Sequence, residues 1–72
     1  MTYTVPADFN LATFLAACLA GGVVLAKDDT HEFPEGSVVL SGVRLEVLIG
    51  ASTPEKVAVI DAAAAAQGGT KL

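Results

Sequence analysis

The stretch from Leu11 to Ala26 contains sixteen consecutive residues without a charged side chain. Such a run can be a membrane span, a secretion signal or the interior of a small globular protein, and each of these requires a different fold. A secretion signal carries Lys or Arg before its apolar region, whereas residues 2–10 contain no base and include Asp8. We therefore expect no signal peptide, and a soluble chain located inside the cell or within a protein assembly such as a virion.

A membrane span requires a longer apolar run than this one. A transmembrane helix needs about 20 apolar residues to cross about 30 Å of hydrocarbon, and sixteen residues rise only about 24 Å in a helix. Gly21 and Gly22 also interrupt the run. We expect no membrane partner on this interpretation. The alternative is a small holin-like membrane protein with residues 9–26 inserted and residues 38–51 re-entrant.

The spacing of the large apolar residues instead predicts an amphipathic helix followed by a short strand. The residues at positions i, i+3, i+4, i+7 and i+8 share one helix face and form the predicted core face: Leu11, Phe14, Leu15, Cys18 and Leu19.

The ends of this helix are marked by residues typical of helix termini. Pro6 suits the first turn, and Asp8 can cap free amides or complement the positive end of the helix. Gly21 can supply the left-handed residue that ends a helix. The β-branched, apolar segment 23–26 then predicts a strand.

The opposite face of this helix is small and uncharged. It consists of Thr13, Ala16, Ala17 and Ala20, and a helix that is apolar all round is normally covered all round. A 72-residue chain can hardly surround a helix, and 53% of its residues are hydrophobic while only 17% are charged, against about 25% charged in typical domains. A single cysteine excludes an internal disulfide. We therefore expect these four residues to form an interface with a second copy or with a larger protein assembly.

Residues 37–50 show the strongest strand pattern. Val43, Leu45, Val47 and Ile49 alternate with other residues and can place one apolar face on a core. Gly42 divides the segment and suggests a bulge or bend. We expect segment 23–26 to pair with it in the antiparallel direction across the polar loop 27–36.

The segment from Ser52 to Gly69 predicts a C-terminal helix that is rich in alanine. Ser52 and Glu55 match a capping box, and Thr53-Pro54 alternatively places proline at the first helical position. Gly68 and Gly69 end the segment. A second interpretation makes residues 56–60 a strand, with Asp61 capping a shorter helix.

These elements predict one α+β domain over residues 1–72. Its order is helix–strand–strand–helix, or the same with a third strand before the last helix. We expect a small antiparallel sheet of two to three strands, with an N-terminal apolar helix and a C-terminal alanine-rich helix.

Few residues are candidates for chemistry or ligand binding. The four bases are spread along a chain of net charge −4, which argues against nucleic-acid binding. The dense polar cluster Asp28, Asp29, His31 and Glu32 could hold a cation, but we expect a solvated loop. Cys18 could be a nucleophile beside His31, although its place on the apolar face favours core packing. We expect no catalytic, cofactor or metal site and no small-molecule substrate.

The sequence thus predicts a non-enzymatic structural subunit that acts through protein–protein packing, such as a small accessory component of a virion-like shell or tail. Besides the holin-like membrane protein, a third class remains open, which is an acidic inhibitor of a basic site on another protein. It would use the four acids of the polar loop: Asp28, Asp29, Glu32 and Glu35.

Overall fold

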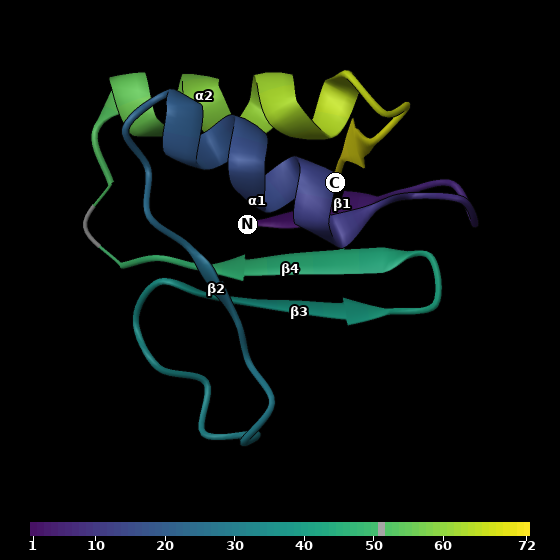
Figure 1. Cartoon of the computed structure of the whole chain (residues 1–72), viewed down its shortest axis with the longest axis horizontal. Helices are drawn as coiled ribbons and strands as arrows, with labels where there is room; N and C mark the ends of the chain where they lie inside the picture. Colours follow the sequence, from purple (N-terminus) through teal and green to yellow (C-terminus); the bar gives the residue numbers. More distant parts are fainter. Residues whose placement is uncertain (51) are drawn as a thin grey trace.

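The structure, a computed structural model, describes residues 1–50 and 52–72. These residues form two helices and a five-stranded mixed sheet, so the fold is α+β as predicted. Both helices lie on the same side of the sheet, and the loop between β2 and β3 extends away from them (Figure 1). In chain order the elements are β1 (Thr2–Thr4), α1 (Leu11–Ala20), β2 (Ala26–Lys27), β3 (Ser37–Ser41), β4 (Arg44–Leu48), α2 (Pro54–Ala65) and β5 (Thr70–Lys71).

The order of the strands across the sheet is β2-β3-β4-β1-β5. β1 is antiparallel to both β4 and β5, and β3 is antiparallel to β4. The prediction of two to three strands is therefore wrong. β1 and β5, which it omitted, span three and two residues and are too short to show the alternation that identifies a strand.

The segment 37–50, predicted as one long strand, is a hairpin of β3 and β4. Gly42 and Val43 form its turn, and Gly42 has a φ of +59°. A positive φ at the first turn residue suits a two-residue hairpin, and glycine adopts it without strain. Gly42 therefore reverses the chain instead of bending one strand, and the inward alternation is kept by Leu45 and Val47, which are fully buried.

Segment 23–26 contributes less to the sheet than predicted, and it pairs in the other direction. Only Ala26 and Lys27 form β2, and they pair with Ser37 and Val38 in parallel register. The predicted antiparallel pairing is wrong because the connecting loop returns the chain to the end of the sheet at which β2 begins.

Helix α1 begins later in the chain than Pro6 and Asp8 suggest. Asn10 is its N-cap, and the side-chain oxygen of Asn10 accepts a hydrogen bond from the backbone N–H of Thr13 at 2.9 Å. Asparagine is among the best capping residues because its short side chain satisfies an otherwise unpaired amide.

The two glycines after α1 have separate roles. Gly22, and not Gly21, adopts the left-handed conformation that ends the helix, with a φ of +87°. Gly21 has an ordinary φ of −88°, but a Cβ atom there would lie 2.5 Å from Cγ1 of Val59 on α2. The absence of a side chain at residue 21 therefore permits the close approach of the two helices.

The buried stripe of α1 is narrower than its spacing predicts. Phe14 and Cys18 are completely buried, Leu11 and Leu15 are partly buried, and Leu19 is 61% exposed. Four of the five predicted residues therefore contact the core, Leu11 and Leu15 at its edge, and Leu19 does not.

Helix α2 is continuous from Pro54 to Ala65, which confirms the single-helix interpretation and excludes a strand over residues 56–60. Thr53 caps it, because its Oγ1 atom accepts a hydrogen bond from the N–H of Lys56 at 3.4 Å. The cap is thus Thr53, followed by Pro54 at the first position, and not Ser52. Gly68, with a φ of +81°, ends the segment as predicted.

The core lies between the helices and the sheet. No helix within residues 1–50 and 52–72 is both long enough and apolar enough to cross a bilayer. Insertion of residues 9–26 into a membrane would require one continuous helix over that range, but α1 ends at Ala20. The buried apolar side chains of the core are Tyr3, Val5, Phe9, Phe14, Cys18, Val23, Val38, Leu45, Val47, Ile60, Ala63 and Ala64.

Candidate functional site

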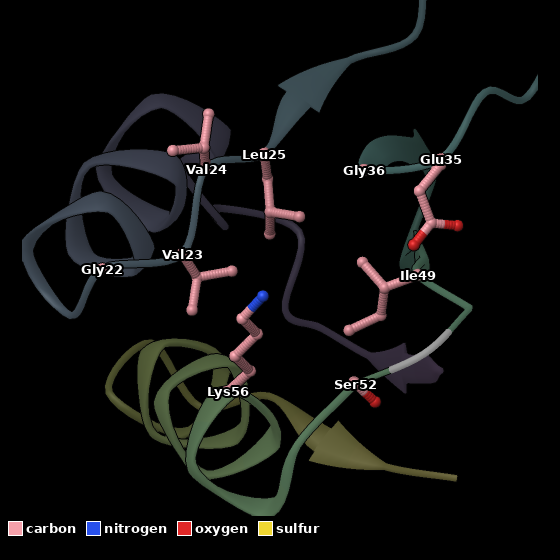
Figure 2. A pocket seen from close by; sticks show the side chains of 9 residues that line it. All are labelled: Gly22, Val23, Val24, Leu25, Glu35, Gly36, Ile49, Ser52 and Lys56. Carbon is pink, nitrogen blue, oxygen red and sulfur yellow. The ribbon is translucent and has the colours of Figure 1, made fainter.

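A cleft of about 320 Å³ opens between the N-terminal turn of α2, the segment that follows α1, and the adjoining ends of β3 and β4 (Figure 2). Val23, Leu25 and Ile49 give it an aliphatic floor. Its complete lining is Gly22, Val23, Val24, Leu25, Glu35, Gly36, Ile49, Ser52 and Lys56. The surface of the cleft is shared between apolar and polar atoms, so it suits a group that combines an apolar part with a polar one.

One of the polar side chains at the margin already has a structural role. The carboxylate of Glu35 accepts hydrogen bonds from the N–H of Gly50 at 2.8 and 2.9 Å. These hydrogen bonds fasten the turn before β3 to Gly50, the second residue after the end of β4. Glu35 is therefore committed to the fold, which removes one of the four acids assigned to an inhibitory loop.

Lys56 supplies the positive charge of the cleft. Its side chain extends from α2 toward the space between Val23 and Ile49 (Figure 2). Lys56 lies in the first turn of α2, where the helix dipole disfavours a cation. Among the described residues the other three bases form ion pairs with acids, and Lys56 forms none. The cleft thus offers an aliphatic floor and one ammonium group, together with the carboxylate of Glu35, which is hydrogen-bonded to Gly50.

The loop of residues 28–33 has a conformation that is fixed by hydrogen bonds within it. The carboxylate of Asp28 accepts hydrogen bonds from the N–H of Thr30 at 3.0 Å, the Oγ1 of Thr30 at 2.9 Å and the N–H of Phe33 at 3.0 Å. The hydrogen bond from the Thr30 amide, with those from the Thr30 hydroxyl and the Phe33 and His31 amides, lowers the pKa of Asp28. His31 and Phe33 both have left-handed φ angles, of 59° and 52°. Asp28 therefore braces this loop.

The loop presents an aromatic side chain to solvent. Phe33 is 54% exposed, and its ring meets the ring of His31 edge-on with centroids 6.4 Å apart. Asp29 and Glu32 are exposed beside it, and Asp29 pairs with Lys27 at 3.6 Å. The loop thus combines an exposed phenyl ring with negative charge.

The structure places all four residues of the predicted interface on one exposed face of α1: Thr13, Ala16, Ala17 and Ala20. α1 contains no charged residue, so this face presents only methyl groups, one hydroxyl and the backbone.

The two predicted candidates for chemistry differ in their surroundings. Cys18 is fully buried, as expected for core packing, and burial raises the pKa of its thiol. A thiolate nucleophile needs the opposite environment. Within residues 1–50 and 52–72 no three His, Cys, Asp or Glu side chains are grouped so that they could hold a metal ion, the acidic loop included.

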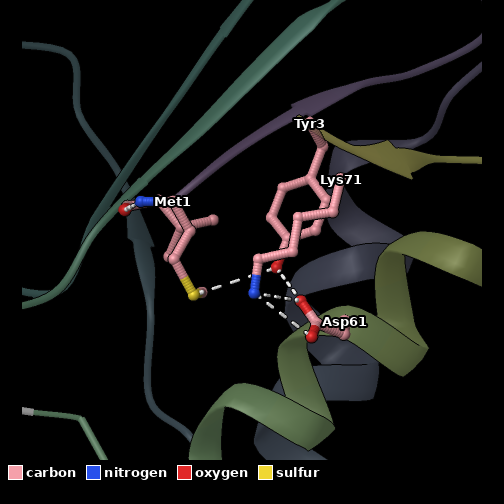
Figure 3. A network of polar contacts seen from close by, with 5 residues as sticks. Met1, Tyr3, Asp61 and Lys71 are labelled. Carbon is pink, nitrogen blue, oxygen red and sulfur yellow. Dashed lines mark hydrogen bonds and ion pairs between the residues drawn. The ribbon is translucent and has the colours of Figure 1, made fainter.

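A polar network that sequence analysis did not identify joins β1, α2 and β5 (Figure 3). The hydroxyl of Tyr3 donates a short hydrogen bond to Asp61, and Nζ of Lys71 lies 3.3 Å from the same carboxylate oxygen. Burial, with the hydrogen bond and charge of Asp61, raises the pKa of Tyr3 far above its ordinary value. Tyr3 and Asp61 are 58 residues apart, and no local pattern connects them. The network holds α2 to the sheet.

Comparison of the chain with protein-family models, curated proteins and solved structures finds no match.

Proposed function

We propose that the protein is a non-enzymatic structural subunit, of the kind found as an accessory component in virion-like shells or tails, and that the outer face of α1 packs against a second copy. The observation that supports this most directly is the exposure of Thr13, Ala16, Ala17 and Ala20 together on a helix without charge.

The chemistry of this face favours protein packing over other contacts. Small side chains let a second helix approach closely and lose little conformational freedom on burial. A chain of net charge −4 repels its own copies, so a contact between copies is best made where charge is absent. Leu19, which is 61% exposed near the end of α1, adds a larger apolar side chain to the helix surface.

The other two classes have less support. An inhibitory acidic loop would need its carboxylates free, but Asp28 and Glu35 are hydrogen-bonded to backbone amides. A holin-like pore former would need residues 9–26 as one inserted helix, and α1 spans only Leu11–Ala20.

The test substitutes a charged residue on the proposed interface. Ala17→Glu would place an unpaired carboxylate in a closed contact, which costs several kcal/mol. On a solvated helix the same change costs within about 0.5 kcal/mol. We expect Ala17→Glu to lower the association constant measured by analytical ultracentrifugation by about tenfold or more. The thermal melting of the dissociated chain should hardly change.

Ala65→Glu is the matched control, because Ala65 is exposed in the last turn of α2 and the substitution adds the same charge. It should associate like the parent chain. The proposal fails if the parent is monomeric at about 100 μM, or if Ala17→Glu associates as strongly as Ala65→Glu.

A further inference from the structure

Phe33 is an exposed aromatic side chain that lies outside the α1 face. Its phenyl ring is 54% exposed, and aromatic side chains are the ones that most often dominate the energy of a protein interface. Asp28 fixes the backbone on which Phe33 is displayed, through the N–H groups of Thr30 and of Phe33 itself. The backbone that carries the ring is therefore held in one conformation, which lowers the cost of ordering the loop on binding.

The cleft has the size and lining to receive such a ring. Its volume is about 320 Å³, and an aliphatic cavity of about 150 Å³ is large enough to bind benzene. Val23, Leu25 and Ile49 form an apolar floor, while Val24 at its edge is 76% exposed. The ring of Phe33 does not line the cleft of its own chain.

Charge complementarity indicates which chain fills the cleft. Lys56 extends into it and forms no ion pair among residues 1–50 and 52–72. The residue before Phe33 is Glu32, an exposed acid. A phenyl ring that enters with Glu32 beside it supplies both an apolar group for the floor and a carboxylate for Lys56.

We propose that the cleft is the docking site for the 28–33 loop of a second copy, with Phe33 on the aliphatic floor and Glu32 facing Lys56. This inference rests on the proposed self-association and adds a second, separate contact to the one through α1. Two distinct contacts per subunit allow an assembly to grow beyond a dimer, as a shell or tail requires.

The two contacts are separated by substituting each of them alone. Val24→Glu blocks the edge of the cleft at an exposed position. Phe33→Asn removes the ring, and asparagine tolerates the left-handed φ of residue 33. We expect Ala17→Glu to leave a weaker species that is held by the loop and the cleft. Adding Val24→Glu or Phe33→Asn to Ala17→Glu should weaken this residual association about tenfold or more, to monomers.

The decisive experiment mixes two monomeric variants at about 100 μM in the ultracentrifuge. Ala17→Glu/Phe33→Asn keeps the cleft, and Ala17→Glu/Val24→Glu keeps the loop. If the loop of one copy enters the cleft of another, the mixture forms a 1:1 dimer although neither variant associates alone.

Val43→Asn in the Ala17→Glu background is the matched control, because Val43 is 52% exposed in the turn between β3 and β4, outside the loop and the cleft, and the substitution likewise replaces an exposed apolar side chain by asparagine. It should associate like the Ala17→Glu parent. Lys56→Glu should weaken the residual association, and Lys56→Glu with Glu32→Lys should restore it.

The inference is overturned if the Ala17→Glu chain is already monomeric, if Phe33→Asn leaves its association unchanged, or if the two variants do not combine. Each of these results leaves the contact through α1 standing. Loss of association in Val24→Glu and Phe33→Asn but not in Ala17→Glu would instead overturn the α1 contact and support the cleft.

Discussion

Helices α1 and α2 cover the same side of the sheet and both end near a glycine with positive φ, but different contacts hold them. α1 carries no charge and completely buries the large side chain of Phe14. α2 buries Ile60 but otherwise two alanines, and its Asp61 binds Tyr3 and Lys71. This difference indicates that α1 is positioned by buried volume, whereas α2 also depends on one polar anchor.

The largest effect is expected from removing the volume that α1 buries. Phe14→Ala should lower the free energy of unfolding by about 3–5 kcal/mol, because the site is completely enclosed and would leave a cavity. Urea denaturation measures this loss. Leu19→Ala, on the same helix but 61% exposed, is the control and should cost much less. Equal losses in the two variants would contradict the assignment of α1 to buried volume.

The contact between the helices should show a steric penalty of intermediate size. In Gly21→Ala the new Cβ atom would lie 2.5 Å from Cγ1 of Val59, and overpacking of this kind costs about 1–3 kcal/mol. Residue 21 has an ordinary φ, so the loss cannot come from backbone strain.

A double-mutant cycle with Val59→Ala identifies the cause of that loss. The combined variant should be less destabilised than the sum of the two single changes, because the smaller residue 59 makes room for the new methyl group. Additive losses would show that the helices do not meet at this point.

The hydrogen bond between Tyr3 and Asp61, which anchors α2, should make the free energy of unfolding depend on pH in the alkaline range. We expect this effect to be smaller than that of the Gly21 substitution. The pKa of Tyr3 is raised from its ordinary value of 10.0 by burial and by Asp61, so the folded chain retains the phenolic proton when the unfolded chain has released it. This contribution is complete well below pH 10 and decreases as the pH rises through 10, by about 1.4 kcal/mol at pH 11.

Tyr3 is the only tyrosine, so ultraviolet absorbance of the phenolate reports its ionisation directly. It should ionise only as the protein unfolds, and Tyr3→Phe should reduce the fall in stability above pH 10. If Tyr3 instead ionises near pH 10 in the folded protein, the hydrogen bond between Tyr3 and Asp61 does not anchor α2.

The features that sequence analysis predicted correctly depend on local patterns. α2 follows from Thr53-Pro54 and Gly68, and the centre of α1 follows from the spacing of Phe14 and Cys18. The exposed small face of α1 also follows from that spacing, but its role as an interface stays a prediction.

The features that sequence analysis missed depend on contacts between distant segments. β1 and β5 become strands because β4 and β1 offer them partners, and three or two residues carry no periodicity of their own. The cleft joins Val23, Ile49 and Lys56 from three separate segments. The turn at Gly42 can be recognised from the sequence only if the segments that form β3 and β4 are already known to pair.

The central place of β1 has a consequence for the order of folding. β1 lies between β4 and β5, both of which are synthesised later, and the amino group of Met1 donates to the carbonyl of Val47, 46 residues away. Contacts of such separation form slowly because a long loop must close first. The hairpin of β3 and β4, joined by a two-residue turn, is the sheet contact that can form earliest. Until β4 has been synthesised, β1 therefore has no partner, and the sheet is complete only after β5 has joined the other edge of β1.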